Sequence, residues 1–219
     1  MEKNNVVFSI GLFLFIGYGI YSYISGVKDY INDSLTLSFT LLLVFFLRKV
    51  LKITPTSLSL LILAFVSHLS GVFGFYNKSP LPLQYDHFTH LIGLFAISIL
   101  VFNAIKSYFS KSIFHNGIVL LFMFFCSLGI GAVVEQIEYI GYIRLGTGAG
   151  LFKFGGLGDT PFNEELLRPM DVIGGGWINT MLDLNYNFLG AIIGIILMYS
   201  INTYKLKKQG YLYGKPQVL

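Results

Sequence analysis

The chain has 219 residues, of which 54% are apolar, 16% aromatic and only 12% charged. A soluble globular domain carries about 25% charged residues, so this composition excludes an ordinary soluble domain, and it equally excludes a disordered chain. A single cysteine, Cys126, excludes a disulfide framework and a zinc site built on cysteines. The net charge of +4 does not indicate nucleic-acid binding, because the basic residues stand between long apolar runs. We therefore expect one membrane domain over residues 1–219.

Apolar runs long enough to cross about 30 Å of hydrocarbon predict six transmembrane helices. We place these helices near residues 6–26, 31–48, 56–76, 87–106, 113–141 and 180–203. We expect the first span to remain as a helix and not to act as a signal peptide, because its N-terminal flank is weakly basic and no A-x-A-like site follows it. The predicted fold class is an all-α polytopic membrane protein.

The distribution of Lys and Arg predicts the orientation of these helices. Ten of the 15 basic residues fall at the two termini and in the loops 48–55 and 106–112, and five fall in the other loops. This bias predicts cytoplasmic termini in a multi-pass protein of the inner membrane. A long loop over residues 142–179, between the fifth and sixth helices, then lies on the outer side. Its Gly-x-Gly-x-Gly run lacks the spacing of a nucleotide-binding loop, so we expect no nucleotide.

Four acidic residues lie at or just inside the ends of predicted spans: Asp86, Glu135, Glu138 and Asp183. Counted at about 1.5 Å per residue from the basic ends of their helices, Asp86, Glu135 and Asp183 reach one depth near the outer interface. The other acids, Asp33 among them, fall in predicted loops or at termini, where a solvated charge is the expected state. Three helices thus present carboxylates in one layer.

Two of these helices repeat a pattern. Residues 86–93 read D-x-x-x-H-x-x-G, and residues 183–190 read D-x-x-x-N-x-x-G. A step of four residues places both polar groups on one helical face. The closing glycines, Gly93 and Gly190, predict a close approach by a neighbouring helix one turn deeper.

Carboxylates that face lipid are costly, so these groups should face one another or a wet cavity. Without a counter-charge they would repel one another and take up protons, and a divalent cation is the simplest missing partner. Carboxylates with one or two histidines suit Zn, Mn, Fe or Mg. We predict the ligands Asp86, His90 and Asp183, a general base at Glu135 or Glu138, and supporting roles for His87, Asn187 and Asp171.

A structural reading of the same residues stays open. The polar pairs could be interhelical hydrogen bonds and protonated acids that pack the bundle. His68 lies in the middle of the third predicted span. It fits such a packed and hydrogen-bonded role better than the role of a residue that hydrogen-bonds to a metal ligand.

The second half of the chain, about residues 84–195, resembles the YjdF-like family of small inner-membrane proteins. The resemblance lies in the 86–93 motif, the Glu135-x-x-Glu138 pair and the run W-x-N-T-x-x-D at 177–183. This chain has Asn179 where the family often has an acid. The resemblance implies a small multi-pass protein of the inner membrane and supplies no established reaction.

From the residues themselves, the leading hypothesis is a metal-dependent hydrolase or transferase that acts on a membrane lipid or lipid-linked substrate at the outer leaflet. The metal would activate a water molecule, a carboxylate would take its proton, and the long loop would cover the site. The chief alternative is a transporter or ion carrier. Transporter sites lie nearer mid-bilayer, and the inner halves of helices four to six carry no ionisable side chain. A third reading, a non-catalytic assembly or immunity factor, predicts no tightly held metal, and the sequence identifies no protein partner.

Overall fold

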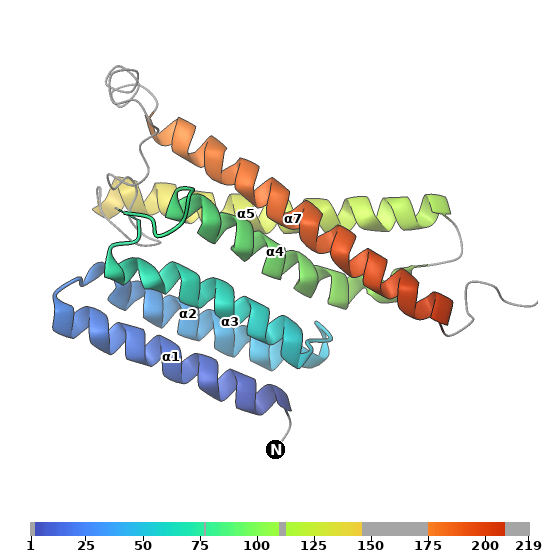
Figure 1. The fold of residues 1–219 in the computed structure, drawn as a ribbon, viewed down its shortest axis with the longest axis horizontal. Helices are drawn as coiled ribbons and strands as arrows, with labels where there is room; N and C mark the ends of the chain where they lie inside the picture. Colours follow the sequence, from blue (N-terminus) through green and yellow to red (C-terminus); the bar gives the residue numbers. More distant parts are fainter. Residues whose placement is uncertain (1–2, 77, 110–112, 146–174, 209–219) are drawn as a thin grey trace, which may run out of the picture.

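The computed structural model describes residues 3–76, 78–109, 113–145 and 175–208. These segments contain six helices that are long and apolar enough to cross a membrane, and no strand (Figure 1). The helices are α1 (Lys3–Ser25), α2 (Asp29–Phe46), α3 (Pro55–Leu69), α4 (Tyr85–Ile105), α5 (Ile113–Leu145) and α7 (Gly175–Lys208). Short 3-10 turns extend α2, α3 and α4: η1 (Leu47–Lys49), η2 (Ser70–Phe73) and η3 (Lys106–Tyr108). The predicted all-α fold with six transmembrane helices is confirmed.

The helix boundaries lie within a few residues of the predicted ones, except at the long connection between α5 and α7. Helix α5 continues to Leu145, and α7 begins at Gly175, five residues before the predicted start at 180. Residues 146–174, and with them Asp171, lie outside the described residues.

Local sequence sets the start of two helices. Thr54 and Ser57 form a reciprocal cap at the start of α3, and Pro55 occupies the first helical position, where its missing N–H costs nothing. Helix α4 begins after a connection that contains Pro80 and Pro82, and Asp86 lies in its first turn. A negative charge there is favoured by the helix dipole. The helix dipole therefore favours a charged Asp86 in the first turn of α4.

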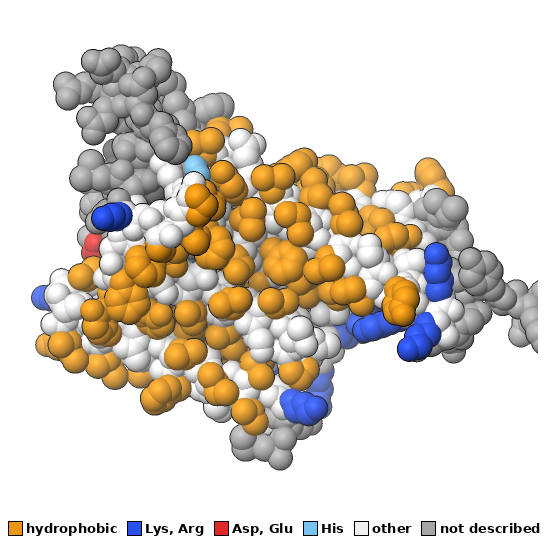
Figure 2. All heavy atoms as spheres, in the orientation of Figure 1, with side chains coloured by type: hydrophobic (Ala, Val, Ile, Leu, Met, Phe, Trp, Pro, Cys, Tyr) orange, Lys and Arg blue, Asp and Glu red, His pale blue; other side chains and the backbone are white. Residues whose placement is uncertain are grey.

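Helix α4 is shared by two apolar cores. One core joins α1, α2 and α3 and includes Phe15, Leu41 and Leu58, together with Leu100 of α4. The other joins α4, α5 and α7 through Phe102, Val119, Met123 and Ile195. Figure 1 shows α4 between the two groups of helices. Large apolar side chains on α1 and α5 are exposed, and Figure 2 shows an apolar face of the kind that lipid covers.

Helices α4 and α7 form the most extensive interface, and Gly190 allows it. A Cβ atom at Gly190 would overlap the backbone oxygen of Leu91 on α4. The close approach predicted for Gly190 is confirmed. The same prediction for Gly93 is wrong, because a Cβ atom there would meet nothing within 4 Å. Helix α4 meets α7 through Leu91 and Phe95, and Gly93 lies two residues from both, on the opposite face.

The two ends of the bundle carry opposite charge. All acidic residues in the described ranges lie at the end where α2, α4 and α7 begin, which we name the acidic end: Asp29, Asp33, Asp86, Glu135, Glu138 and Asp183. Basic side chains gather at the other end, where α4 and α7 finish (Figure 2): Arg48, Lys49, Lys52, Lys106, Lys205, Lys207 and Lys208. Among the described residues only three basic side chains, Lys28, Lys78 and Arg144, lie at the acidic end, and the orientation prediction rests on this bias of Lys and Arg.

The orientation can be tested with two single-cysteine variants in a Cys126→Ser background. Pro80→Cys at the acidic end and Ser107→Cys at the basic end are both exposed positions and leave the Lys and Arg distribution unchanged. In spheroplasts treated with a membrane-impermeant maleimide, we expect labelling at position 80, and labelling at 107 only after permeabilisation. The reverse pattern would invert the topology and place the acidic end on the cytoplasmic side.

Candidate metal centre

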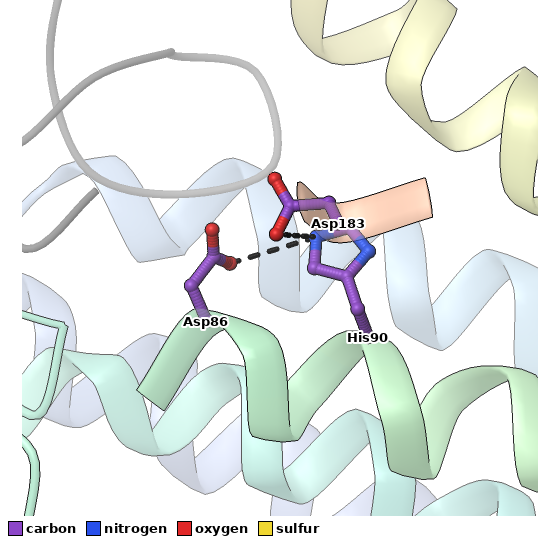
Figure 3. Close-up of side chains that lie close together, drawn as sticks. All are labelled: Asp86, His90 and Asp183. Carbon is purple, nitrogen blue, oxygen red and sulfur yellow. Dashed lines mark ion pairs between the residues drawn. The ribbon is translucent and has the colours of Figure 1, made fainter. Parts of the chain in front are cut away.

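His90 lies at the centre of a buried polar cluster at the acidic end. Its Nε2 atom is 3.5 Å from Oδ1 of Asp86, one turn earlier on α4, and 3.8 Å from Oδ1 of Asp183 on α7. Asp183 is fully buried, His90 is buried, and Asp86 is half-buried. Figure 3 shows the two carboxylates on the same side of the imidazole ring.

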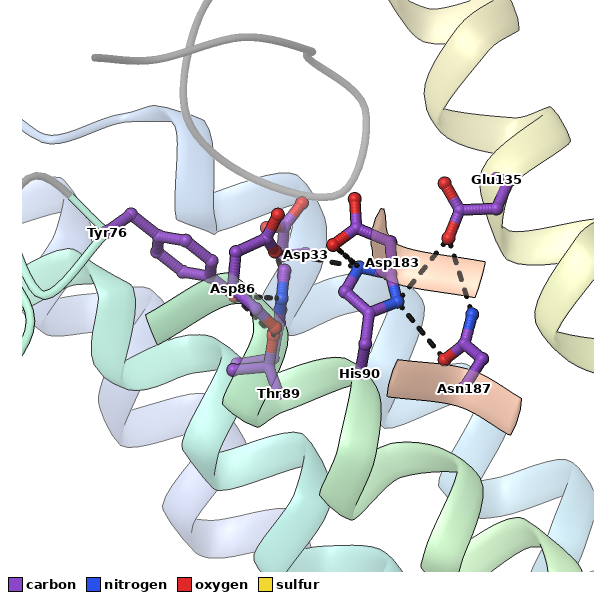
Figure 4. A network of polar contacts seen from close by, with 9 residues as sticks. Asp33, Tyr76, Asp86, Thr89, His90, Glu135, Asp183 and Asn187 are labelled. Carbon is purple, nitrogen blue, oxygen red and sulfur yellow. Dashed lines mark hydrogen bonds and ion pairs between the residues drawn. The ribbon is translucent and has the colours of Figure 1, made fainter. Parts of the chain in front are cut away.

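The other ring nitrogen of His90 faces α5 and a deeper part of α7. Nδ1 is 3.2 Å from Oδ1 of Asn187 and 3.4 Å from Oε1 of Glu135. The amide nitrogen of Asn187 donates to the same Glu135 oxygen over 3.4 Å. One imidazole thus contacts side chains from three helices, α4, α5 and α7 (Figure 4).

Two sets of side chains have the spacing of metal ligands. One ligand atom from each of Asp86, His90 and Asp183 lies within 4.8 Å of the others, and the same holds for His90, Glu135 and Glu138. The two sets share His90. The two sets use different ring nitrogens, because each nitrogen can bind one ion. Nε2 lies beside Asp86 and Asp183 of the first set, and Nδ1 lies beside Glu135 of the second. Four carboxylates around a single imidazole leave excess negative charge in a poorly hydrated site, which a divalent cation would offset.

One atom of the cluster has an unmet hydrogen-bonding capacity. Oε2 of Glu135 is buried and has no hydrogen-bond partner among the residues that the structure describes. A buried carboxylate oxygen without a partner is costly, and a water molecule or an ion beside it would remove that cost. The donor set of carboxylate oxygens and one imidazole fits Zn, Mn, Fe or Mg.

The structure brings together most of the residues singled out in the sequence: Asp86, His90, Glu135, Glu138, Asp183 and Asn187. His87 lies beside them, but its ring stacks on Tyr186 with the centroids 4.4 Å apart and the planes at 10°. Its Nε2 atom is buried and has no hydrogen-bond partner in the described part of the chain. Nothing can be said of Asp171, which lies outside the described ranges.

Asp33 is not the solvated loop charge that the sequence predicted. It lies one turn inside α2, its exposed fraction is 1%, and its Oδ2 atom is 2.9 Å from Nε2 of His68 on α3. The prediction failed because a place near the start of a helix was taken to mean exposure to solvent, whereas α3 packs against this turn of α2 and covers Asp33. His68 has the hydrogen-bonded position that the sequence indicated.

A second polar chain runs from this ion pair to α4. The hydroxyl of Tyr76, in the connection between α3 and α4, is 2.8 Å from Nδ1 of His68 and 3.4 Å from Oγ1 of Thr89. Sequence reasoning missed the chain, since its members are far apart in sequence and sit on elements that share no motif. The available signal was a histidine in mid-span, which needs a polar partner in a membrane.

Six apolar helices, three of which hold a cluster of His, Asp, Glu and Asn side chains at one end, define a multi-pass membrane protein with a buried polar site. The chain belongs to the family described as predicted membrane protein (DUF2238), whose model matches residues 4–204. This membership agrees with the resemblance to YjdF-like proteins. No curated protein and no solved structure matches the chain.

Proposed function

We propose that this protein is a metal-dependent hydrolase or transferase of the inner membrane that acts on a membrane lipid or lipid-linked substrate. The observation that carries the proposal is the convergence of Asp86, His90 and Asp183, whose ligand atoms lie within 4.8 Å of one another at one end of the bundle. That end is the level at which lipid head groups meet the helices. With cytoplasmic termini, it faces the outer leaflet.

The surroundings of His90 suit a metal ligand. With an ion on Nε2, the Nδ1–H group donates to Asn187, and the amide of Asn187 donates to Glu135. Such a chain behind a ligating histidine fixes the ring and raises its basicity. Glu135 and Asn187 then support the ligand, while Asp86 and Asp183 contribute the remaining charge.

The chemistry that a divalent ion supplies here is activation of a bound water molecule and polarisation of the bond that breaks. Glu138 is the proposed general base, since it belongs to the second ligand set and one oxygen of Glu135 already accepts from Asn187. Glu135 is the other candidate, because its second oxygen is buried without a partner among the described residues. Either carboxylate would take a proton from the water.

A carrier fits less well. Between the cluster and the basic end, residues 91–105, 116–134 and 184–204 of α4, α5 and α7 contain no Asp, Glu, His, Lys or Arg. A path for protons or cations across the membrane is usually marked by ionisable groups in both halves. The acidic side chains of these three helices are all at one end, as in an enzyme that is open to one leaflet.

The proposal is tested by metal analysis of protein purified in mild detergent. We expect about one divalent ion per chain and a lower melting temperature after chelation, because removal of the ion leaves carboxylates crowded around His90. This loss should shrink at lower pH, where protons neutralise the same acids. Protein that never holds metal, and whose melting is indifferent to added Zn, Mn or Mg, would refute the metalloenzyme and leave a packing role.

A further inference from the structure

A hydrogen-bonded chain outside the metal centre connects the first three helices to α4. Asp33 on α2 pairs with His68 on α3, His68 meets Tyr76 in the α3–α4 connection, and Tyr76 meets Thr89 on α4 (Figure 4). Thr89 in turn donates to the backbone oxygen of Asp86 over 2.7 Å. The chain therefore ends one turn from His90, beside the proposed ligands.

The direction of these bonds follows from counting protons. The only hydroxyl proton of Thr89 goes to the Asp86 carbonyl, so its oxygen can only accept from Tyr76. Because the single phenolic proton of Tyr76 is then used, the Tyr76 oxygen must accept from His68, and Nδ1 of His68 must carry a hydrogen. A further proton lies between Nε2 and the Asp33 carboxylate. All the donors point toward α4.

Tyr76 is held in place for this role by tight packing. Its ring stands edge-on to Tyr85, with the centroids 5.4 Å apart, and it covers Gly71, where any Cβ atom would overlap the ring. Burial, and after it the negative charge of Asp86, raises the pKa of Tyr76 well above its ordinary value. The phenol therefore keeps its proton until a strongly basic oxygen takes it. Its contact with Thr89, which donates to the backbone oxygen of Asp86, places the hydroxyl beside the first turn of α4.

We propose that Asp33, His68 and Tyr76 form a proton relay that serves the metal centre, with Tyr76 as the group that protonates the departing oxygen of the substrate. The relay rests on the proposed function. As water attacks, its oxygen bonds to the centre under attack and its proton passes to the general base. The bond to the departing oxygen breaks with its electron pair on that oxygen, which takes the phenolic proton, and Nδ1 of His68 reprotonates Tyr76. In this step the phenolic proton that Tyr76 donates to Thr89 in the resting structure goes to the substrate oxygen. The general base then releases its proton to solvent and His68 takes one up from solvent, so that both groups return to their starting states.

The relay also narrows the substrate class. A proton donor accelerates departure of a strongly basic oxygen, such as the alkoxide of an aliphatic alcohol, and does little for a weakly basic one. We infer that the protein cleaves or transfers an ester or phosphoester of an aliphatic alcohol, such as a lipid head-group bond. Asp33 and His68 are positioning residues, since they act through Tyr76.

The kinetic test uses Tyr76→Phe and two diacylglycerol phosphodiesters, one with a glycerol leaving group and one with p-nitrophenolate, which departs without a proton. For the variant we expect kcat to fall by about 100-fold on the glycerol lipid, with KM unchanged and with little loss on the p-nitrophenyl lipid. Metal content should equal that of the wild type. An equal loss on both lipids would overturn the relay, because a purely structural defect does not depend on the leaving group.

A second readout needs no turnover. The chain has four histidines, so nitrogen-15 labelling of histidine gives few ring signals, and His68→Gln identifies those of His68. We expect a protonated Nδ1 at neutral pH that changes its shift in Tyr76→Phe. A neutral ring with a bare Nδ1 would overturn the relay. If the wild type holds no metal and cleaves neither lipid, the proposed function fails, and with it the role of the chain, while the ring signals still show whether the hydrogen-bonded chain exists.

Discussion

Asp183→Asn is expected to remove most of the bound metal from the purified protein. Asp183 is fully buried, and one of its oxygens lies within 4.8 Å of the ligand atoms of Asp86 and His90. An amide is a weak ligand for these ions and carries no charge to offset theirs. Loss of a residue that only hydrogen-bonds to a metal ligand lowers the affinity for the metal by roughly 10–100-fold. Loss of a ligand itself should therefore lower that affinity by at least about 100-fold. Elemental analysis and a competition titration with a chelator measure this effect.

Glu138→Gln is the matched control. It also replaces a carboxylate of the cluster by an amide, but we propose Glu138 as the base and not as a ligand of the ion held by Asp86, His90 and Asp183. This variant should keep its metal and lose turnover. Full metal content in Asp183→Asn, or equal metal loss in both variants, would contradict the assignment of ligands.

Gly190→Val should cause a large loss of stability at the contact between α4 and α7. A side chain at this position meets the backbone oxygen of Leu91, and a helix backbone cannot move aside as a flexible side chain does. Overpacking typically costs about 1–3 kcal/mol, and this contact should reach the upper end of that range. Reversible unfolding in detergent micelles gives the change in the free energy of unfolding.

Gly93→Val provides the comparison at the equivalent position of the other motif. A Cβ atom at Gly93 meets nothing within 4 Å, so we expect a change of less than about 1 kcal/mol. Similar losses for the two variants would mean that helix propensity, and not the approach of α7 to α4, determines the effect at Gly190.

The sequence predicted the helices well because length and hydropathy alone decide which segments span a membrane. It also predicted that Asp86, Glu135 and Asp183 share a depth, because helical rise converts residue counts into height. What it could not supply was rotation about each helix axis. Gly93 and Gly190 occupy the same place in their motifs, yet only Gly190 lies in a helix interface.

The partnership of Asp33 with His68 shows the second limit. Asp33 lies near the start of α2, where a charge is usually solvated, and only the position of α3 beside it makes it part of a buried ion pair. Pairs between helices depend on which helices are neighbours, and charge patterns along one chain do not contain that information. His87 is a second example. It is only three residues from His90 and was predicted to support the cluster, but its ring stacks on Tyr186.

Because α4 contributes to both apolar cores, the two cores form at different times during synthesis of the chain. Helices α1, α2 and α3 can pack as they leave the ribosome, because their core needs only Leu100 from α4. The part of α4 that meets α7, with His90 and Ser98 buried in the finished protein, has to wait for α7, the last helix to be synthesised. Until then these polar groups face lipid or a translocation partner. A chain interrupted before residue 175 would therefore be inserted in the membrane without the interface between α4 and α7, and it would lack Asp183, one of the three proposed ligands.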